Sequence, residues 1–106
     1  MAAIALAPLD AVADGKALRV EHDVIDFVVV RAGSDVYVLE DRCSHGDIPL
    51  SEGEVDGCFI ECWLHGSTFD LRTGVPTSPP AASPVKTFPV TISEVDGTPT
   101  VFVEIG

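Results

Sequence analysis

The chain has few basic residues. Lys and Arg total 6 against 17 Asp and Glu among 106 residues, so the formal net charge is −11. A surface of this sign repels phosphate backbones, which argues against nucleic-acid binding. The charge suits a protein that stays dissolved and meets partners through their basic patches.

Long apolar runs are absent as well. No segment approaches the roughly 20 apolar residues that a membrane-spanning helix needs. The apolar residues 1–7 contain no Lys or Arg and are followed by Pro8 and Asp10, so they make a poor secretion signal. We therefore expect a cytoplasmic protein that does not contact a membrane. The length and the hydrophobic fraction of 46% indicate a single folded domain, residues 1–106.

Helical periodicity is scarce, and the sequence reads as short strands. Residues 8–13 form the one candidate for a helical turn, with Pro8 at its start. The dipeptide Asp96-Gly97 and the stretch 32–35 are hairpin signals. This pattern predicts an all-β fold with an antiparallel β-sandwich or barrel-like base, and loops at 41–53 and 71–85. The expected strands are Lys16–Glu21, Ile25–Arg31, Val36–Glu40, Gly57–Glu61, Lys86–Ser93 and Pro99–Glu104.

Cysteine is rare, and its odd count of 3 argues against a disulfide framework. Two of the three lie in paired motifs, Cys43-Ser44-His45-Gly46 and Cys62-Trp63-Leu64-His65-Gly66. Each motif brings a thiolate and an imidazole together, the ligand types expected for iron or zinc. The third, Cys58, lies in an expected strand and is predicted to be a small buried hydrophobic residue outside the ligand set.

The two motifs resemble those of the Rieske proteins. The resemblance implies one [2Fe–2S] cluster per chain, with Cys43 and Cys62 on one iron and His45 and His65 on the other. It also implies the Rieske fold, with a small cluster-binding subdomain of two loops at about 41–70 and a proline loop at about 76–84. The residues alone leave a structural zinc site as an alternative, although zinc spacings usually pair Cys with Cys and His with His.

Three absences indicate one branch of this family. The extra cysteines that bridge the loops of respiratory Rieske proteins are replaced by Ile48 and Leu64, and we expect neither the membrane anchor of those proteins nor the catalytic domain of the terminal oxygenases. The chain thus resembles the free ferredoxin of bacterial multicomponent aromatic-ring dioxygenases. This implies a monomeric one-electron carrier, with no catalytic residues of its own, between an NAD(P)H-dependent ferredoxin reductase and a terminal Rieske oxygenase. The alternatives are a small Rieske-type subunit of a nitrite reductase and a zinc-stabilised binding module without redox activity.

Two features near the motifs bear on the reduction potential of the cluster and on how the protein docks with its partners. Ser67 stands where high-potential relatives place a hydroxyl that bonds a cluster sulfur, but Phe69 replaces their Tyr. We therefore expect a potential near the low end of the Rieske range, roughly −150 mV rather than +300 mV. Seven acidic residues lie in 40–61 against Arg42 alone. They are expected either to solvate turns or to form a negative field for a basic docking patch.

Overall fold

The computed structural model describes residues 2–22, 25–43, 48–63, 66–77 and 83–105. Within these ranges the regular elements are strands and two short 3₁₀ helices, which confirms the all-β prediction. No helix within them is long and apolar enough to cross a membrane. The elements in chain order are β1 (Ala2–Pro8), η1 (Leu9–Ala11), β2 (Lys16–Glu21), β3 (Asp26–Ala32), β4 (Asp35–Glu40), η2 (Leu50–Glu52), β5 (Val55–Asp56), β6 (Phe59–Glu61), β7 (Thr68–Asp70), β8 (Thr87–Phe88), β9 (Val90–Val95) and β10 (Thr98–Ile105).

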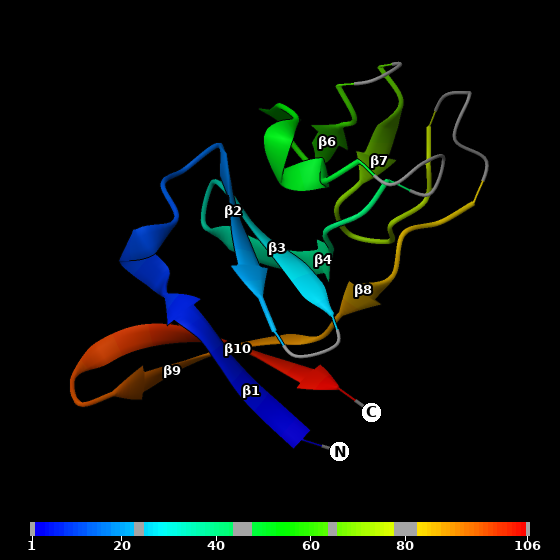
Figure 1. Ribbon diagram of the computed structural model, residues 1–106. Helices are drawn as coiled ribbons and strands as arrows, with labels where there is room; N and C mark the ends of the chain where they lie inside the picture. The colour runs from blue at the N-terminus through cyan, green and yellow to red at the C-terminus, as the bar shows by residue number, and fades with distance from the viewer. Residues whose placement is uncertain (1, 23–24, 44–47, 64–65, 78–82, 106) are drawn as a thin grey trace.

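The strands form three antiparallel sheets, with strand orders β1-β10-β9, β2-β3-β4-β8 and β5-β6-β7. Figure 1 shows the β1-β10-β9 sheet at one end of the molecule, the β5-β6-β7 sheet at the other, and the four-stranded sheet between them. The middle sheet is therefore covered on both faces. Cys43 and Cys62 pack in one cluster with Ile60 of β6 and Phe69 of β7.

Strand β3 explains why the middle sheet can be covered on both sides. Successive side chains of a strand point to opposite faces. Val28 and Val30 pack into the hydrophobic cluster beside the β5-β6-β7 sheet, whereas Phe27 and Val29 pack into a second cluster against β10. All four residues are 0% exposed. A continuous apolar run, rather than an alternating one, is the pattern that a strand buried on both faces requires.

The structure corrects three details of the strand prediction. Residues 2–8 form β1, which pairs with β10, because Ile4 and Leu6 alternate with alanines and face the core. The expected strand 86–93 is split into β8 and β9 at Pro89, which has no N–H to continue a ladder. The expected strand 57–61 begins only at Phe59, since the preceding residues form a turn. The helical turn expected at 8–13 is present as η1.

Candidate metal centre

Cys43 is held near the start of the first loop, defined here as residues 41–53. It lies three residues beyond the end of β4 and is 1% exposed. Its backbone N–H donates to the carbonyl oxygen of Ile48 at 2.8 Å, which closes the loop. The predicted ligand His45 lies between these two residues in the sequence, outside the described ranges.

Cys62 has the same local position in the second loop, residues 62–67. It follows β6 directly and is 2% exposed. Its backbone N–H donates to the carbonyl oxygen of Ser67 at 2.7 Å, and the N–H of Gly66 donates to the carbonyl oxygen of Cys62 at 2.9 Å. Gly66 has a φ of 75°, in the left-handed region that glycine adopts without steric cost. The predicted ligand His65 lies outside the described residues.

The two loops share one geometry, in which the cysteine amide donates to the carbonyl five residues further on. Both cysteines are free of disulfides and belong to one hydrophobic cluster, together with Val28, Leu39 and Leu50. A thiolate surrounded by apolar side chains is unfavourable unless a cation compensates its charge. Two buried thiols, each with a histidine in the sequence of its loop, therefore fit an iron or zinc centre.

The third cysteine lies apart from this pair. Cys58 is half-buried in the turn between β5 and β6, beside a cavity of about 270 Å³ that Asp14 and Gly33 also line. The prediction that it is buried within a strand is wrong, because Gly57, with a φ of 58°, places residues 57–58 in the turn. Cys58 does not belong to the cluster that contains the other two cysteines, which supports its exclusion from the ligand set.

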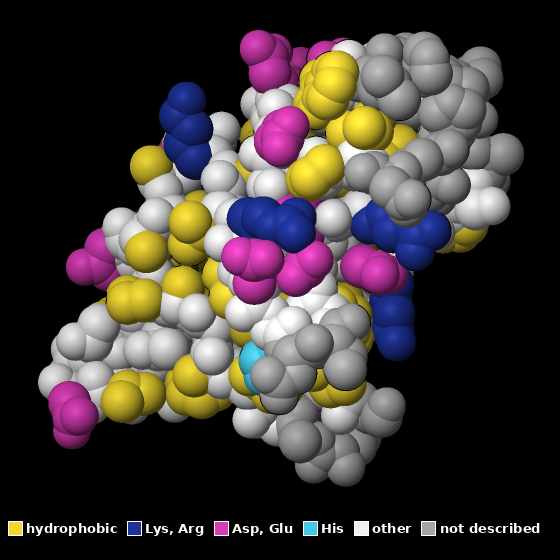
Figure 2. All heavy atoms as spheres, viewed as in Figure 1, with side chains coloured by type: hydrophobic (Ala, Val, Ile, Leu, Met, Phe, Trp, Pro, Cys, Tyr) yellow, Lys and Arg dark blue, Asp and Glu magenta, His cyan; other side chains and the backbone are white. Residues whose placement is uncertain are grey.

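The acidic residues around the first loop do not all face solvent. Asp41 is 5% exposed, and its carboxylate accepts hydrogen bonds from Arg19 Nη1 at 2.9 Å and from the Ser51 N–H at 2.7 Å. The hydrogen bond from Arg19 to Asp41 raises the pKa of the guanidinium above its ordinary value, so Arg19 stays cationic. Asp41 therefore belongs to the interior and not to a surface field. Glu52 and Glu54 are exposed, as expected. Figure 2 shows acidic side chains next to basic ones near the middle of one face and further acidic side chains at its upper end.

Comparison with known proteins decides the family. A family model described as the Rieske [2Fe-2S] domain matches residues 2–89. The chain belongs to this Rieske family. It is 38% identical over 89 residues to the biphenyl dioxygenase ferredoxin subunit of Pseudomonas sp. (strain KKS102), covering 83% of this chain and 82% of the relative. It is 37% identical over 90 residues to the 3-phenylpropionate/cinnamic acid dioxygenase ferredoxin subunit of Escherichia coli (strain K12), covering 84% of each.

Solved structures show the same Rieske fold. The ferredoxin of carbazole 1,9a-dioxygenase from Nocardioides aromaticivorans IC177 matches with a TM-score of 0.87 and 33% identity, covering 97% of each chain. A second match, with a TM-score of 0.86 and 35% identity, comes from a complex of reduced oxygenase and oxidised ferredoxin in carbazole 1,9a-dioxygenase. It covers 95% of this chain and 91% of that one. The Rieske fold predicted from the two motifs is thus confirmed.

The first residues of the predicted proline loop lie against β7. Pro76 forms an isolated antiparallel bridge with Phe69, and the N–H of Thr77 donates to the carbonyl oxygen of Thr68 at 2.8 Å. The segment 76–77 therefore runs along β7, the strand that leaves the second loop. The rest of the predicted proline loop, including Pro79 and Pro80, lies outside the described residues.

Two Rieske positions singled out in the sequence are buried. Ser67 is 1% exposed at the end of the second loop, and Phe69 is 0% exposed in the same hydrophobic cluster as Cys43 and Cys62. Gly53, which the sequence did not single out, lies against the end of β6, where the second loop begins. A Cβ added there would stand 1.6 Å from the carbonyl oxygen of Glu61, the residue before Cys62. No sequence pattern marks this contact, because it joins two segments only through their backbones.

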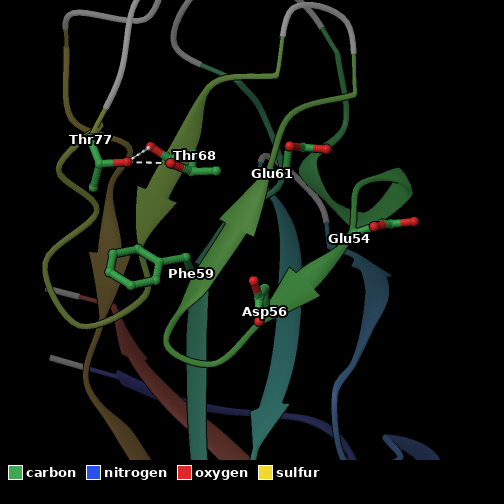
Figure 3. Close-up of a pocket in the computed structure, with 6 residues that line it drawn as sticks. All are labelled: Glu54, Asp56, Phe59, Glu61, Thr68 and Thr77. Carbon is green, nitrogen blue, oxygen red and sulfur yellow. Dashed lines mark hydrogen bonds between the residues drawn. The ribbon is translucent and has the colours of Figure 1, made fainter.

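A shallow pocket of about 290 Å³ lies on the β5-β6-β7 sheet. Figure 3 shows its lining residues, with the carboxylates of Glu54, Asp56 and Glu61 and the ring of Phe59. Thr68 and Thr77 line the same pocket and are joined by a hydrogen bond between their hydroxyls. Phe59 is 37% exposed, so an aromatic ring is accessible among acids at this surface.

Proposed function

We propose that this chain is the one-electron carrier of a multicomponent aromatic-ring dioxygenase. An NAD(P)H-dependent ferredoxin reductase would reduce it, and a terminal Rieske oxygenase would receive the electron. The observation that carries the proposal is the pair of buried, disulfide-free cysteines in loops closed in the same way. They lie on a fold that matches a dioxygenase ferredoxin over 97% of both chains.

The proposed ligands are Cys43 and Cys62 for one iron and His45 and His65 for the other. The bound [2Fe–2S] cluster, one per chain, would supply a site that takes up and releases a single electron. The residues 41–70 and the proline loop 76–84 would form the cluster-binding part of a single domain. The apolar side chains around the two thiols exclude water from them.

The relatives also indicate which proteins this chain contacts and whether it acts on an organic substrate itself. Two matched relatives are ferredoxin subunits of dioxygenases, and one matched structure is a complex with an oxygenase. This supports a carrier that docks on a larger catalytic protein and performs no reaction on an organic substrate. We further propose that the chain acts as a monomer in the cytoplasm, without nucleic-acid or membrane partners. The match to dioxygenase ferredoxins along most of the chain favours this function over a nitrite-reductase subunit or a zinc module.

Reconstitution tests the function. The purified protein is expected to be red-brown and to contain iron and acid-labile sulfide in equal amounts. NAD(P)H with a ferredoxin reductase of a dioxygenase system should bleach its visible absorption, and a terminal Rieske oxygenase should restore the colour by taking the electron. Stopped-flow absorbance follows both steps. A colourless protein that contains zinc would contradict the proposal, as would a red-brown protein that no reductase reduces.

Ser67 provides a test of how the chain sets the potential. Ser67→Ala is expected to lower the midpoint potential of the cluster by tens of millivolts. The Ser67 hydroxyl is proposed to donate a hydrogen bond to the cluster, and this bond stabilises the reduced cluster more because that state is more negative. Ser93→Ala, an exposed serine on β9 at the other end of the fold, is the matched control and should leave the potential unchanged. Protein-film voltammetry gives both values. Equal midpoints for the two variants would remove Ser67 from this role.

A further inference from the structure

The two loops of the proposed centre are held at their bases by different means. The second loop is the connection of a hairpin, because Glu61 of β6 pairs with Thr68 of β7 immediately outside it. The first loop leaves β4 after Glu40 and ends in the 3₁₀ helix Leu50–Glu52. Among the described residues, no strand ladder joins these two ends. The Cys43–Ile48 hydrogen bond closes the loop nearer its tip, and a different interaction joins its two ends at the base.

A buried carboxylate makes this connection. Asp41 Oδ1 accepts from the backbone N–H of Ser51 at 2.7 Å, and Asp41 Oδ2 accepts from Ser51 Oγ at 2.6 Å. The same Oδ2 accepts from Arg19 Nη1 at 2.9 Å. The backbone N–H of Asp41 donates to the carbonyl oxygen of Asp26 at 2.7 Å. The side chain thus ties the two ends of the first loop to each other and to β2.

The burial of this carboxylate argues for a specific role. Asp41 is the only charged residue among the buried ones that the structure describes, and its side chain is 0% exposed. A buried charge is unfavourable unless hydrogen bonds and an opposite charge compensate it. Arg19 supplies that charge from the surface, where its side chain is 35% exposed and also pairs with the exposed Asp26. A carboxylate that only kept the loop in contact with water would lie at the surface and would not need these buried hydrogen bonds.

We propose that Asp41, with Arg19 and Ser51, is a positioning network that holds the first loop in its cluster-binding conformation. It replaces, for this loop, the strand pairing that holds the second loop. Asp41 acts through the backbone, since it stands two residues before Cys43 in the chain. The inference rests on the proposed function only in assigning the first loop to the cluster.

The test compares Asp41→Asn with the wild-type holoprotein. The amide side chain keeps the shape but loses the charge that Arg19 compensates. Hydrogen exchange measured by mass spectrometry is expected to be about tenfold faster in peptides from 41–51 and unchanged in peptides from 59–70. Loss of the visible absorption in excess iron chelator is also expected to be about tenfold faster.

Asp26→Asn is the matched control. It removes the exposed partner of Arg19 and leaves every bond to the Asp41 carboxylate in place. Exposed ion pairs contribute little, so neither exchange nor cluster loss should change. If Asp41→Asn yields no folded protein, Ser51→Ala carries the test, since it removes only the hydroxyl bond. Ser51→Thr restores a hydroxyl and should recover the wild-type rates.

If hydrogen exchange in Asp41→Asn is faster by the same factor in both loops, or is unchanged in both, the positioning role is overturned. A loop-specific change supports it even if no reductase reduces the protein. That combination would overturn the proposed function and leave this inference standing. A loop-specific change that Asp26→Asn reproduces would instead assign the effect to Arg19 at the surface and overturn the role of Asp41.

Discussion

Cys43→Ala and Cys62→Ala proteins are expected to be purified colourless and without iron. Each change removes one of the two thiolates proposed to hold one iron. Apart from the two cysteines, the buried residues of their cluster are apolar and offer no replacement ligand. Visible absorbance and iron analysis of the purified variants measure the effect. The same loss is expected for His45→Ala and His65→Ala.

Cys58→Ala is the matched control for these variants. It removes the third thiol of the chain, which lies in the turn between β5 and β6 outside that cluster. Its spectrum and iron content should equal those of the unchanged protein. Loss of colour in Cys58→Ala, or full iron content in Cys62→Ala, would show that the ligand set is wrong.

Gly53→Ala is expected to destabilise the protein strongly and to loosen its metal centre. The new Cβ would stand 1.6 Å from the carbonyl oxygen and 2.8 Å from the carbonyl carbon of Glu61. Both are backbone atoms, so relief requires the first loop and the end of β6 to move apart. Overpacking typically costs about 1–3 kcal/mol and occasionally more, and the backbone neighbour here places Gly53→Ala at about 3 kcal/mol. For a domain of this size, this lowers the thermal unfolding midpoint by ~10 °C or more.

Gly57→Ala separates this contact from the general effect of replacing a glycine. Gly57 has a φ of 58° but nothing within 4 Å of its added Cβ, so only the backbone strain of about 1–2 kcal/mol applies. Differential scanning calorimetry of the two holoproteins should give a clearly smaller decrease for Gly57→Ala. Its cluster should also survive chelator longer than that of Gly53→Ala. Equal decreases would mean that the approach of Gly53 to Glu61 does not restrict the loops.

Much of the fold follows from local patterns in the sequence. The run Phe27–Val30 predicts a strand, and Asp96-Gly97 predicts the hairpin of β9 and β10, because both signals depend on neighbouring residues alone. The cysteine motifs predict the two loops for the same reason. The structure confirms the strand at 26–32, the hairpin of β9 and β10, and the Rieske fold. The histidine ligands stay a prediction, since they lie outside the described residues.

Features that depend on distant partners could not be predicted in this way. β1 alternates Ile4 and Leu6 with alanine, which is a weak strand former, so this local pattern becomes a strand only where β10 supplies a partner. The sequence alone does not distinguish Asp41 from an exposed carboxylate in a turn. Its burial depends on hydrogen bonds from Arg19 and Ser51, which are distant in the sequence. The contact of Gly53 with the backbone before Cys62 likewise exists only in three dimensions.

The pairing of β1 with β10 has a consequence for synthesis on the ribosome. Ala2 lies opposite Ile105, so β1 emerges from the ribosome long before the strand that it pairs with. Until β10 follows, Val101 and Val103 are missing from the cluster that covers this face of the middle sheet, so Phe27 and Val29 are less completely buried. Uncovered strands of this kind are the species that aggregate during folding. A nascent chain that contains β8 but not yet β10 is therefore expected to be more prone to aggregate than the complete chain.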